Sequence, residues 1–87
     1  MLTSDKISMS VSFSNFDESV RVYKNIKTYI ETFMYQYIDD ILETVEPRFD
    51  RYERVYYFEF EFPRNLPNKY LANIIKLMKG YSLDKTL

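Results

Sequence analysis

Several residue types on which proteins commonly build chemistry are missing from this sequence. It has no cysteine, no histidine and no tryptophan, and it has one glycine. Without cysteine there is neither a disulfide framework nor a thiolate nucleophile, and without histidine the commonest general base is lacking. A single glycine leaves no glycine-rich loop to hold phosphate. We therefore predict a protein that is not an enzyme, uses no cofactor or metal, and is held together by packing.

Long apolar runs and a surplus of either charge are missing as well. No apolar run approaches the length of a membrane span, and residues 1–9 lack the basic start and apolar core of a signal peptide. The formal net charge is −1, which gives no overall attraction to nucleic acid or to an anionic membrane. We expect a cytoplasmic protein of a bacterial, archaeal or virus-infected cell that does not bind membranes.

The abundant residues indicate the kind of genome that encodes the chain. Amino acids with AT-rich codons, namely Phe, Tyr, Met, Ile, Asn and Lys, total 39, against 10 for Gly, Ala, Arg and Pro. The gene therefore comes from an AT-rich genome. In size and codon bias the chain is similar to the accessory proteins of phages and mobile elements, some of which inhibit or modulate host protein complexes. No motif carries that likeness.

Hydrophobic periodicity predicts the first two elements of a single domain over residues 1–87. Apolar residues alternate with serines over residues 6–13, a pattern typical of a strand with one covered face. Residues 16–45 contain neither Gly nor Pro, and their apolar side chains recur at helical spacing over an arc of about 140°. Asn15 or the serine before it can cap this helix, and Pro47 ends it. We predict one long helix over residues 16–45.

The second half of the chain repeats this order. Residues 51–62 predict a strand whose aromatic face should meet the long helix. Residues 63–68 are a turn, and Asn68 is a plausible cap for a short helix over residues 69–79. Residues 80–87 are expected to form a flexible tail.

These elements predict a small two-layer α+β domain in the order strand, long helix, strand, short helix. Two strands joined by a helical crossover are normally parallel. Two strands alone make a poor sheet, and pairing with a second copy is the simplest way to complete it. We therefore expect a homodimer whose sheet is completed by dimerisation.

The predicted long helix displays more apolar surface than one small sheet can cover. Tyrosine-rich patches are typical of protein interfaces, where a rigid ring adds contact area and carries a polar tip. Acidic residues on the opposite side of the helix suit charge selection of a basic partner. We therefore predict a module that binds an unidentified protein as well as itself. The residues predicted to carry this contact are Val22, Tyr29, Tyr35, Leu42, Asp39 and Glu43.

Other functions compete with this interpretation. Arg48, Arg51 and Arg54 stand beside tyrosines, and interleaved arginines and aromatic rings can bind single-stranded nucleic acid, although acids are scattered among them. A structural subunit of a larger assembly is a further alternative. The stretch Tyr37-Ile38-Asp39-Asp40 resembles the metal-binding turn of reverse transcriptases, but it lies within a helical pattern in a chain far too short for that fold.

Overall fold

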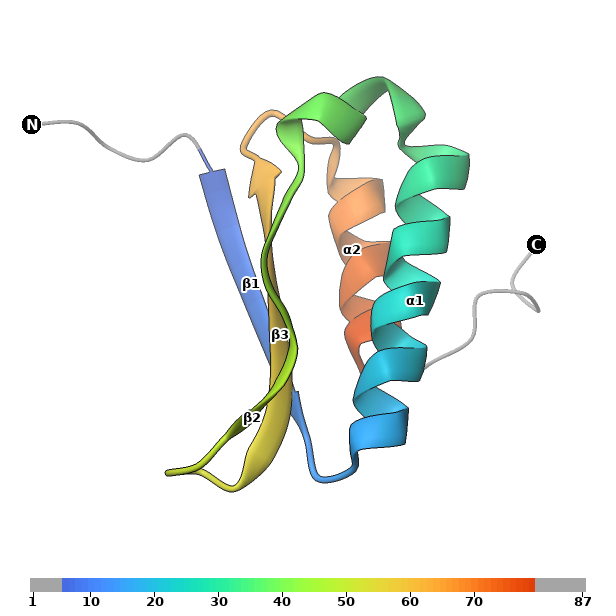
Figure 1. The fold of residues 1–87 in the computed structure, drawn as a ribbon. Coiled ribbons are helices and arrows are strands. Elements are labelled where there is room, and N and C mark those ends of the chain that lie inside the picture. Colours follow the sequence, from blue (N-terminus) through green and yellow to red (C-terminus); the bar gives the residue numbers. More distant parts are fainter. Residues whose placement is uncertain (1–5, 80–87) are drawn as a thin grey trace, which may run out of the picture.

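The computed structural model describes residues 6–79, apart from the side chain of Thr44, and shows a small α+β fold (Figure 1). A three-stranded sheet forms one layer and two α-helices form the other. The predicted tail over residues 80–87 lies outside the described residues. In chain order the elements are β1 (Lys6–Phe13), α1 (Phe16–Phe33), the 3₁₀-helix η1 (Tyr35–Asp40), β2 (Leu42–Asp50), β3 (Val55–Pro63) and α2 (Asn68–Met78).

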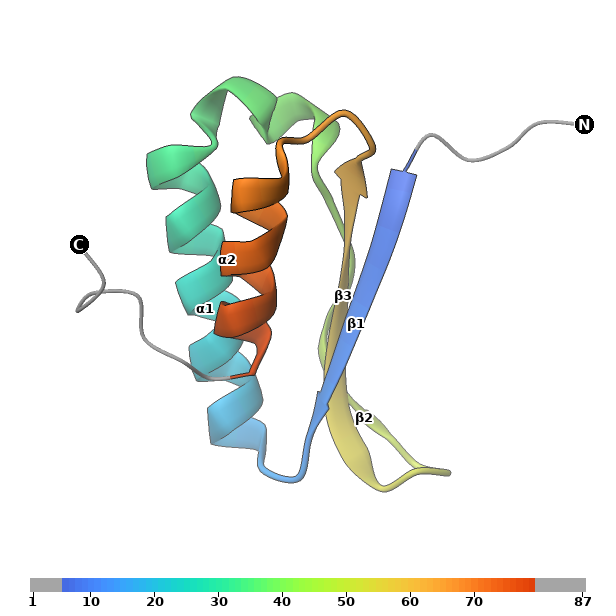
Figure 2. The ribbon, with the colours of Figure 1, turned by 180° about the vertical axis from the view of Figure 1, so that it is seen from behind.

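The sheet has the strand order β1-β3-β2, and β3 is antiparallel to both of its neighbours. β1 and β2 therefore run in the same direction, and α1 carries the chain from one edge to the other. Both helices lie on the same face of the sheet (Figure 1 and Figure 2). The predicted parallel pairing of the first and last strands is wrong. The crossover through α1 leads to β2 at the other edge of the sheet, and the chain then turns back to form β3 between β1 and β2, antiparallel to both.

The predicted continuous helix over residues 16–45 is also wrong. α1 ends at Phe33, and Met34 leaves the helical region with φ −121° before η1 and β2 follow. Pro47 ends no helix but lies inside β2, between residues where the register with β3 shifts. A residue without an N–H group is tolerated in an edge strand or a bulge. Pairing with β3 has overridden the helical spacing of the apolar residues in this segment.

The core lies between the sheet and the helices. Phe58, Phe60 and Phe62 alternate along β3 and are buried, which confirms the predicted aromatic face. Tyr23 of α1 packs on the first two of these rings, with centroid distances of 5.6 and 5.8 Å. Burying a Phe side chain contributes about 1.5–3 kcal/mol, so this row of rings is a main source of cohesion between the two layers.

The helix ends agree with the sequence in one case and differ in the other. The side chain of Asn15 accepts a hydrogen bond from the Glu18 N–H at 3.0 Å, which confirms the predicted start of α1. At α2 the capping position is Pro67, with no side-chain hydrogen bond, so the predicted capping by Asn68 is wrong. No helix within residues 6–79 has the length and apolar character needed to cross a membrane.

Candidate protein-binding surfaces

Two of the predicted contact residues lie in the core. Val22 is 0% exposed and Tyr29 is 9% exposed, so neither belongs to a surface left over for a partner. The Tyr29 hydroxyl accepts a hydrogen bond from the Asn73 side-chain amide of α2 at 2.8 Å. The prediction was wrong for these two residues because α2 packs against this flank of α1, which one sheet alone would have left bare.

The other apolar candidates lie at the end of the molecule formed by η1. Tyr35 is 72% exposed at the start of η1, and Leu42 is about half exposed at the start of β2. The exposed ring of Phe33 and the exposed carboxylate of Asp39 lie in the same stretch of chain. We call Phe33, Tyr35, Asp39 and Leu42 the η1 end, at the top of Figure 1.

Glu43 does not share a face with Asp39, because the two residues lie on different elements rather than on one helix. Glu43 is opposite Phe60 in the register and therefore points to the helix side of the sheet, where its Oε1 lies 3.1 Å from Lys27 Nζ. Its other carboxylate oxygen is buried without a hydrogen-bond partner. Burial, and then the neighbouring Glu46 carboxylate, raise the pKa of Glu43. Glu43 is thus a partly buried ion-pair residue and not part of an open acidic face.

A small hollow lies beside this ion pair. Its volume is ≈ 140 Å³. The walls come from α1, η1, β2 and β3 and are mainly apolar. Its lining residues are Lys27, Ile30, Glu31, Ile38, Ile41, Glu43 and Phe60. This volume is below the range of about 300–1,000 Å³ typical of small-molecule sites. The hollow therefore gives little support to a ligand site.

The opposite end of the molecule is the turn that joins β2 to β3, which the sequence did not predict. The Asp50 side chain accepts hydrogen bonds from the Tyr52 N–H at 2.9 Å and the Glu53 N–H at 3.3 Å. The Arg54 N–H donates to the Asp50 carbonyl at 2.7 Å, and Arg54 has a φ of 59°. A left-handed residue other than glycine costs about 1–2 kcal/mol, so the surrounding bonds must hold this turn in shape.

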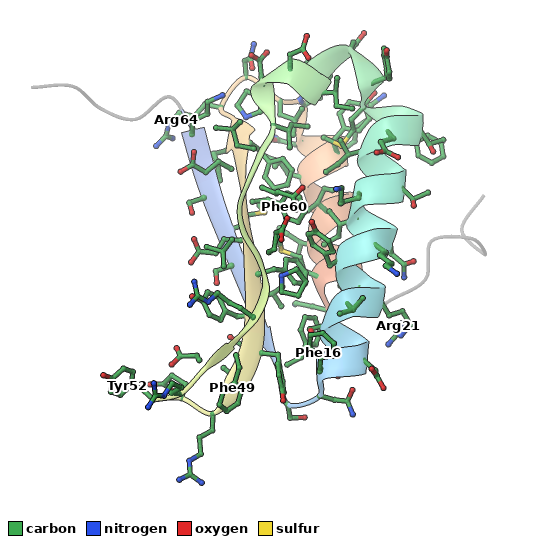
Figure 3. All side chains as sticks on the ribbon, in the orientation of Figure 1. Phe16, Arg21, Phe49, Tyr52, Phe60 and Arg64 are labelled. Carbon is green, nitrogen blue, oxygen red and sulfur yellow. The ribbon has the colours of Figure 1, made fainter. Side chains whose placement is uncertain are left out.

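This turn presents an aromatic side chain almost wholly to solvent. Tyr52 is 97% exposed and points away from the body of the molecule (Figure 3). Behind it, the half-buried ring of Tyr56 contacts Phe49 at 5.0 Å and Phe16 at 5.5 Å between centroids. Phe49 and Phe16 are themselves 45% and 48% exposed. We call Phe16, Phe49, Tyr52 and Tyr56, together with the exposed Arg51 and Arg54, the hairpin end.

The arginines predicted for nucleic acid all fall in the β2–β3 hairpin. Arg51 and Arg54 flank Tyr52 in the turn, and Arg48 is exposed on β2. Arg48 lies opposite Tyr57 of β3. The residues on either side of Tyr57 point to the core, so Tyr57 and Arg48 both face the side of the sheet away from the helices. The structure thus places Arg51 and Arg54 in the turn of the hairpin and Arg48 on the outer face of β2.

The hairpin end could have been found only through its turn. The run Asp50-Arg51-Tyr52-Glu53-Arg54 begins with an aspartate that can bond the backbone two and three residues later, which is a known turn signal. That signal was missed because residues 51–54 were assigned to the predicted strand over residues 51–62, which is wrong for these four residues, since β3 begins at Val55.

Among residues 6–79, no group of three or more His, Cys, Asp and Glu side chains is placed to hold a metal ion. Comparisons with protein-family models, with curated proteins and with solved structures found no match to this chain.

Proposed function

We propose that this chain is a non-enzymatic module that binds another protein, with the hairpin end as its principal contact surface. The observation that carries the proposal is Tyr52, which is 97% exposed on a turn fixed by hydrogen bonds. Tyrosine and arginine are enriched among the residues that dominate binding energy, and aromatic residues are enriched in interface cores. Here both types stand together on one protruding turn.

The order of this turn supports the same proposal. Binding costs free energy when loops and side chains must first be immobilised. The Asp50 side chain and carbonyl already accept three backbone hydrogen bonds within the turn, from Tyr52, Glu53 and Arg54. The backbone that carries Tyr52 therefore needs little further ordering when a partner binds.

The η1 end supports a second, weaker contact. Tyr35 and Leu42 stay candidates there because both are exposed, and Asp39 can select a basic partner. We also propose that the chain pairs with a second copy, which extends its three-stranded sheet. The composition keeps a phage or mobile-element accessory protein, acting on a host complex, as the proposed biological setting.

An affinity experiment with two matched variants tests the principal contact. The wild-type chain, Tyr52→Ala and Tyr35→Ala are immobilised and exposed to extract of the native host, and the bound proteins are identified by mass spectrometry. Both variants remove one exposed tyrosine, but from opposite ends of the molecule. We expect a protein retained by the wild type and by Tyr35→Ala and lost with Tyr52→Ala. Retention of every bound protein by Tyr52→Ala contradicts the assignment to the hairpin end.

Nucleic-acid binding is the second candidate, because the exposed Arg51 and Arg54 lie in the same turn as the exposed Tyr52. Against it, Glu53 lies in the same turn, and Glu59 and Glu61 lie on the sheet face that no described helix covers. A titration with single-stranded DNA at two salt concentrations separates the candidates. We expect no tight binding, whereas tight binding that weakens steeply with salt favours this second candidate.

A further inference from the structure

The two edges of the sheet differ in how well they are protected against pairing. Along β2 the register with β3 shifts twice, between Glu43 and Val45 and between Val45 and Arg48, and Pro47 interrupts the row of N–H donors. Bulges and proline are known means of blocking an edge strand. β2 is therefore a poor template for another strand.

β1 has none of these features. Its eight residues pair with β3 one to one, without a shift, and include no proline. Its single charged residue is Lys6, at its first position, whose Nζ donates to the Asp40 carbonyl at 2.8 Å. Within residues 6–79, no strand pairs with the other edge of β1. This edge offers a regular row of backbone donors and acceptors.

The side chains of β1 are suited to a second copy of β1. The three serines from Ser8 to Ser12 are exposed on one face, and Ile7, Met9 and Val11 are only half buried on the other. Residues directly opposite each other on antiparallel strands share a face. In two antiparallel copies of β1 related by a two-fold axis, even-numbered residues can lie opposite even-numbered residues and odd opposite odd. In that register each serine lies opposite a serine, and each apolar residue lies opposite an apolar residue.

Resting on the self-association proposed above, we propose that the β1 edge is the dimer seam, with two copies of β1 antiparallel about an axis at Ser10. Ser10 then lies opposite Ser10 of the second copy, Ser8 opposite Ser12, and Met9 opposite Val11. Lys6 lies outside the paired segment and keeps its bond to Asp40. The two three-stranded sheets join into one of six strands, with all helices on the same face.

The half-buried apolar residues of β1 give a reason for this arrangement. In one subunit Ile7, Met9 and Val11 lie at the edge of the apolar sheet face that α1 and α2 cover. Pairing at β1 brings the same edge of the second copy alongside, so the apolar side chains of the two copies cover one another. Main-chain hydrogen bonds across the seam supply affinity, as in other complexes that add a strand to a sheet edge.

Cross-linking tests the seam directly, because the chain has no cysteine of its own. Ser10→Cys places two thiols on the axis, about 5 Å apart between Cβ atoms, within reach of oxidation or a short bis-thiol reagent. The control is Ser14→Cys, which is exposed just beyond β1 and lies far from its counterpart across the axis. We expect a covalent dimer with Ser10→Cys and not with Ser14→Cys. Ser8→Cys and Ser12→Cys should cross-link with each other more than either does alone.

Light scattering of the wild-type chain separates failure of the seam from failure of self-association. A dimer in solution that gives no Ser10→Cys cross-link overturns the seam while leaving self-association standing. A monomer at millimolar concentration overturns both. A non-covalent variant gives an independent measure, since Ser10→Glu puts like charges opposite each other across the axis and beside Glu59, the β3 residue opposite Ser10. We expect its dissociation constant to rise at least tenfold, with the control Thr28→Glu, at an exposed position of α1, unchanged, and equal constants for the two variants overturn the seam.

Discussion

The two ends of the molecule both expose aromatic side chains, but they hold them differently. At the hairpin end, Tyr52 lies on a turn fixed by Asp50, and the rings of Phe16 and Phe49 each contact the ring of Tyr56. At the η1 end, Tyr35 begins a 3₁₀-helix whose capping residue, Met34, makes no side-chain hydrogen bond. Exposure alone is therefore a weak guide to a binding surface. The hairpin end is the stronger candidate because the Asp50 side chain holds its backbone in addition to the backbone hydrogen bond, whereas η1 is held by backbone hydrogen bonds such as that from the Tyr37 N–H to the Met34 carbonyl.

The largest expected effect distinguishes the η1 end from the core beneath it. Tyr29 and Tyr35 are six residues apart in sequence, yet the first is buried and bonded to Asn73 while the second is exposed. We expect Tyr29→Ala to lower the free energy of unfolding by about 3 kcal/mol, as for other large buried side chains. Tyr35→Ala should change it by less than about 0.5 kcal/mol. Urea denaturation measures both, and equal losses contradict the separation of surface from core.

The next effect compares the two ends in binding. Once a partner is identified, Tyr52→Ala should weaken its binding by at least about 2 kcal/mol, as is typical of dominant interface residues. Tyr35→Ala should cost less than about 1 kcal/mol with the same partner. Calorimetric titration gives both values. A larger loss with Tyr35→Ala reverses the ranking of the two surfaces.

A third prediction concerns the order of the hairpin turn. Asp50→Ala removes the acceptor for the Tyr52 and Glu53 N–H groups and should destabilise the fold by about 1–2 kcal/mol. The matched change at the η1 end is Asp39→Ala, an exposed aspartate for which we expect less than about 0.5 kcal/mol. Thermal unfolding compares them. Similar small losses would show that the turn is no better fixed than the η1 end.

The left-handed residue of the same turn gives a smaller effect. Only glycine adopts a positive φ without steric cost, so Arg54→Gly should be more stable than Arg54→Ala by about 1 kcal/mol. Both variants lose the guanidinium group and should weaken partner binding equally if that group makes the contact. Unfolding and binding measured on the same pair separate backbone strain from side-chain contact. No stability difference between the two variants contradicts the left-handed conformation.

The smallest effect is a pH dependence beside the η1 end. Because the pKa of Glu43 is raised in the folded protein, its charged form destabilises the fold above that pKa, and Lys27 offsets part of the cost. Lowering the pH from 7 through the raised pKa should therefore increase the stability of the wild type relative to Glu43→Gln, whose side chain does not titrate. Urea unfolding of both proteins at pH 7 and in mild acid tests the direction. A relative loss of wild-type stability in acid contradicts it.

The sequence predicted the parts of the fold whose periodicity allows one interpretation. Strict alternation identified β1 and the buried face of β3, and the polar run before Phe16 identified the start of α1. Residues 34–45 could not be assigned this way, because their apolar spacing fits an α-helix, whereas residues 35–40 form η1 and the residues from Leu42 on pair with β3. The boundary at Met34 carries no glycine or proline that would have signalled it.

The candidate surfaces were less predictable than the fold, since they depend on which elements meet. A helical wheel placed Val22 and Tyr29 at the flank of the long helix, but it could not show that α2 covers that flank. The aromatic contacts of Phe16 and Phe49 with Tyr56 join residues from three elements and need the hairpin to exist. Exposure of Tyr35 and Leu42 was predicted correctly, although for a helix that does not extend that far.

The interrupted register of β2 limits the number of subunits that can assemble through the sheet edges. If two subunits meet along β1, both outer strands of the combined sheet are copies of β2, with Pro47 and its irregular pairing. Neither outer strand is a good template for a third subunit, so assembly stops at two and does not continue into a filament. A chain rich in aromatic residues can in this way expose one strand that pairs with another subunit and still avoid open-ended polymerisation.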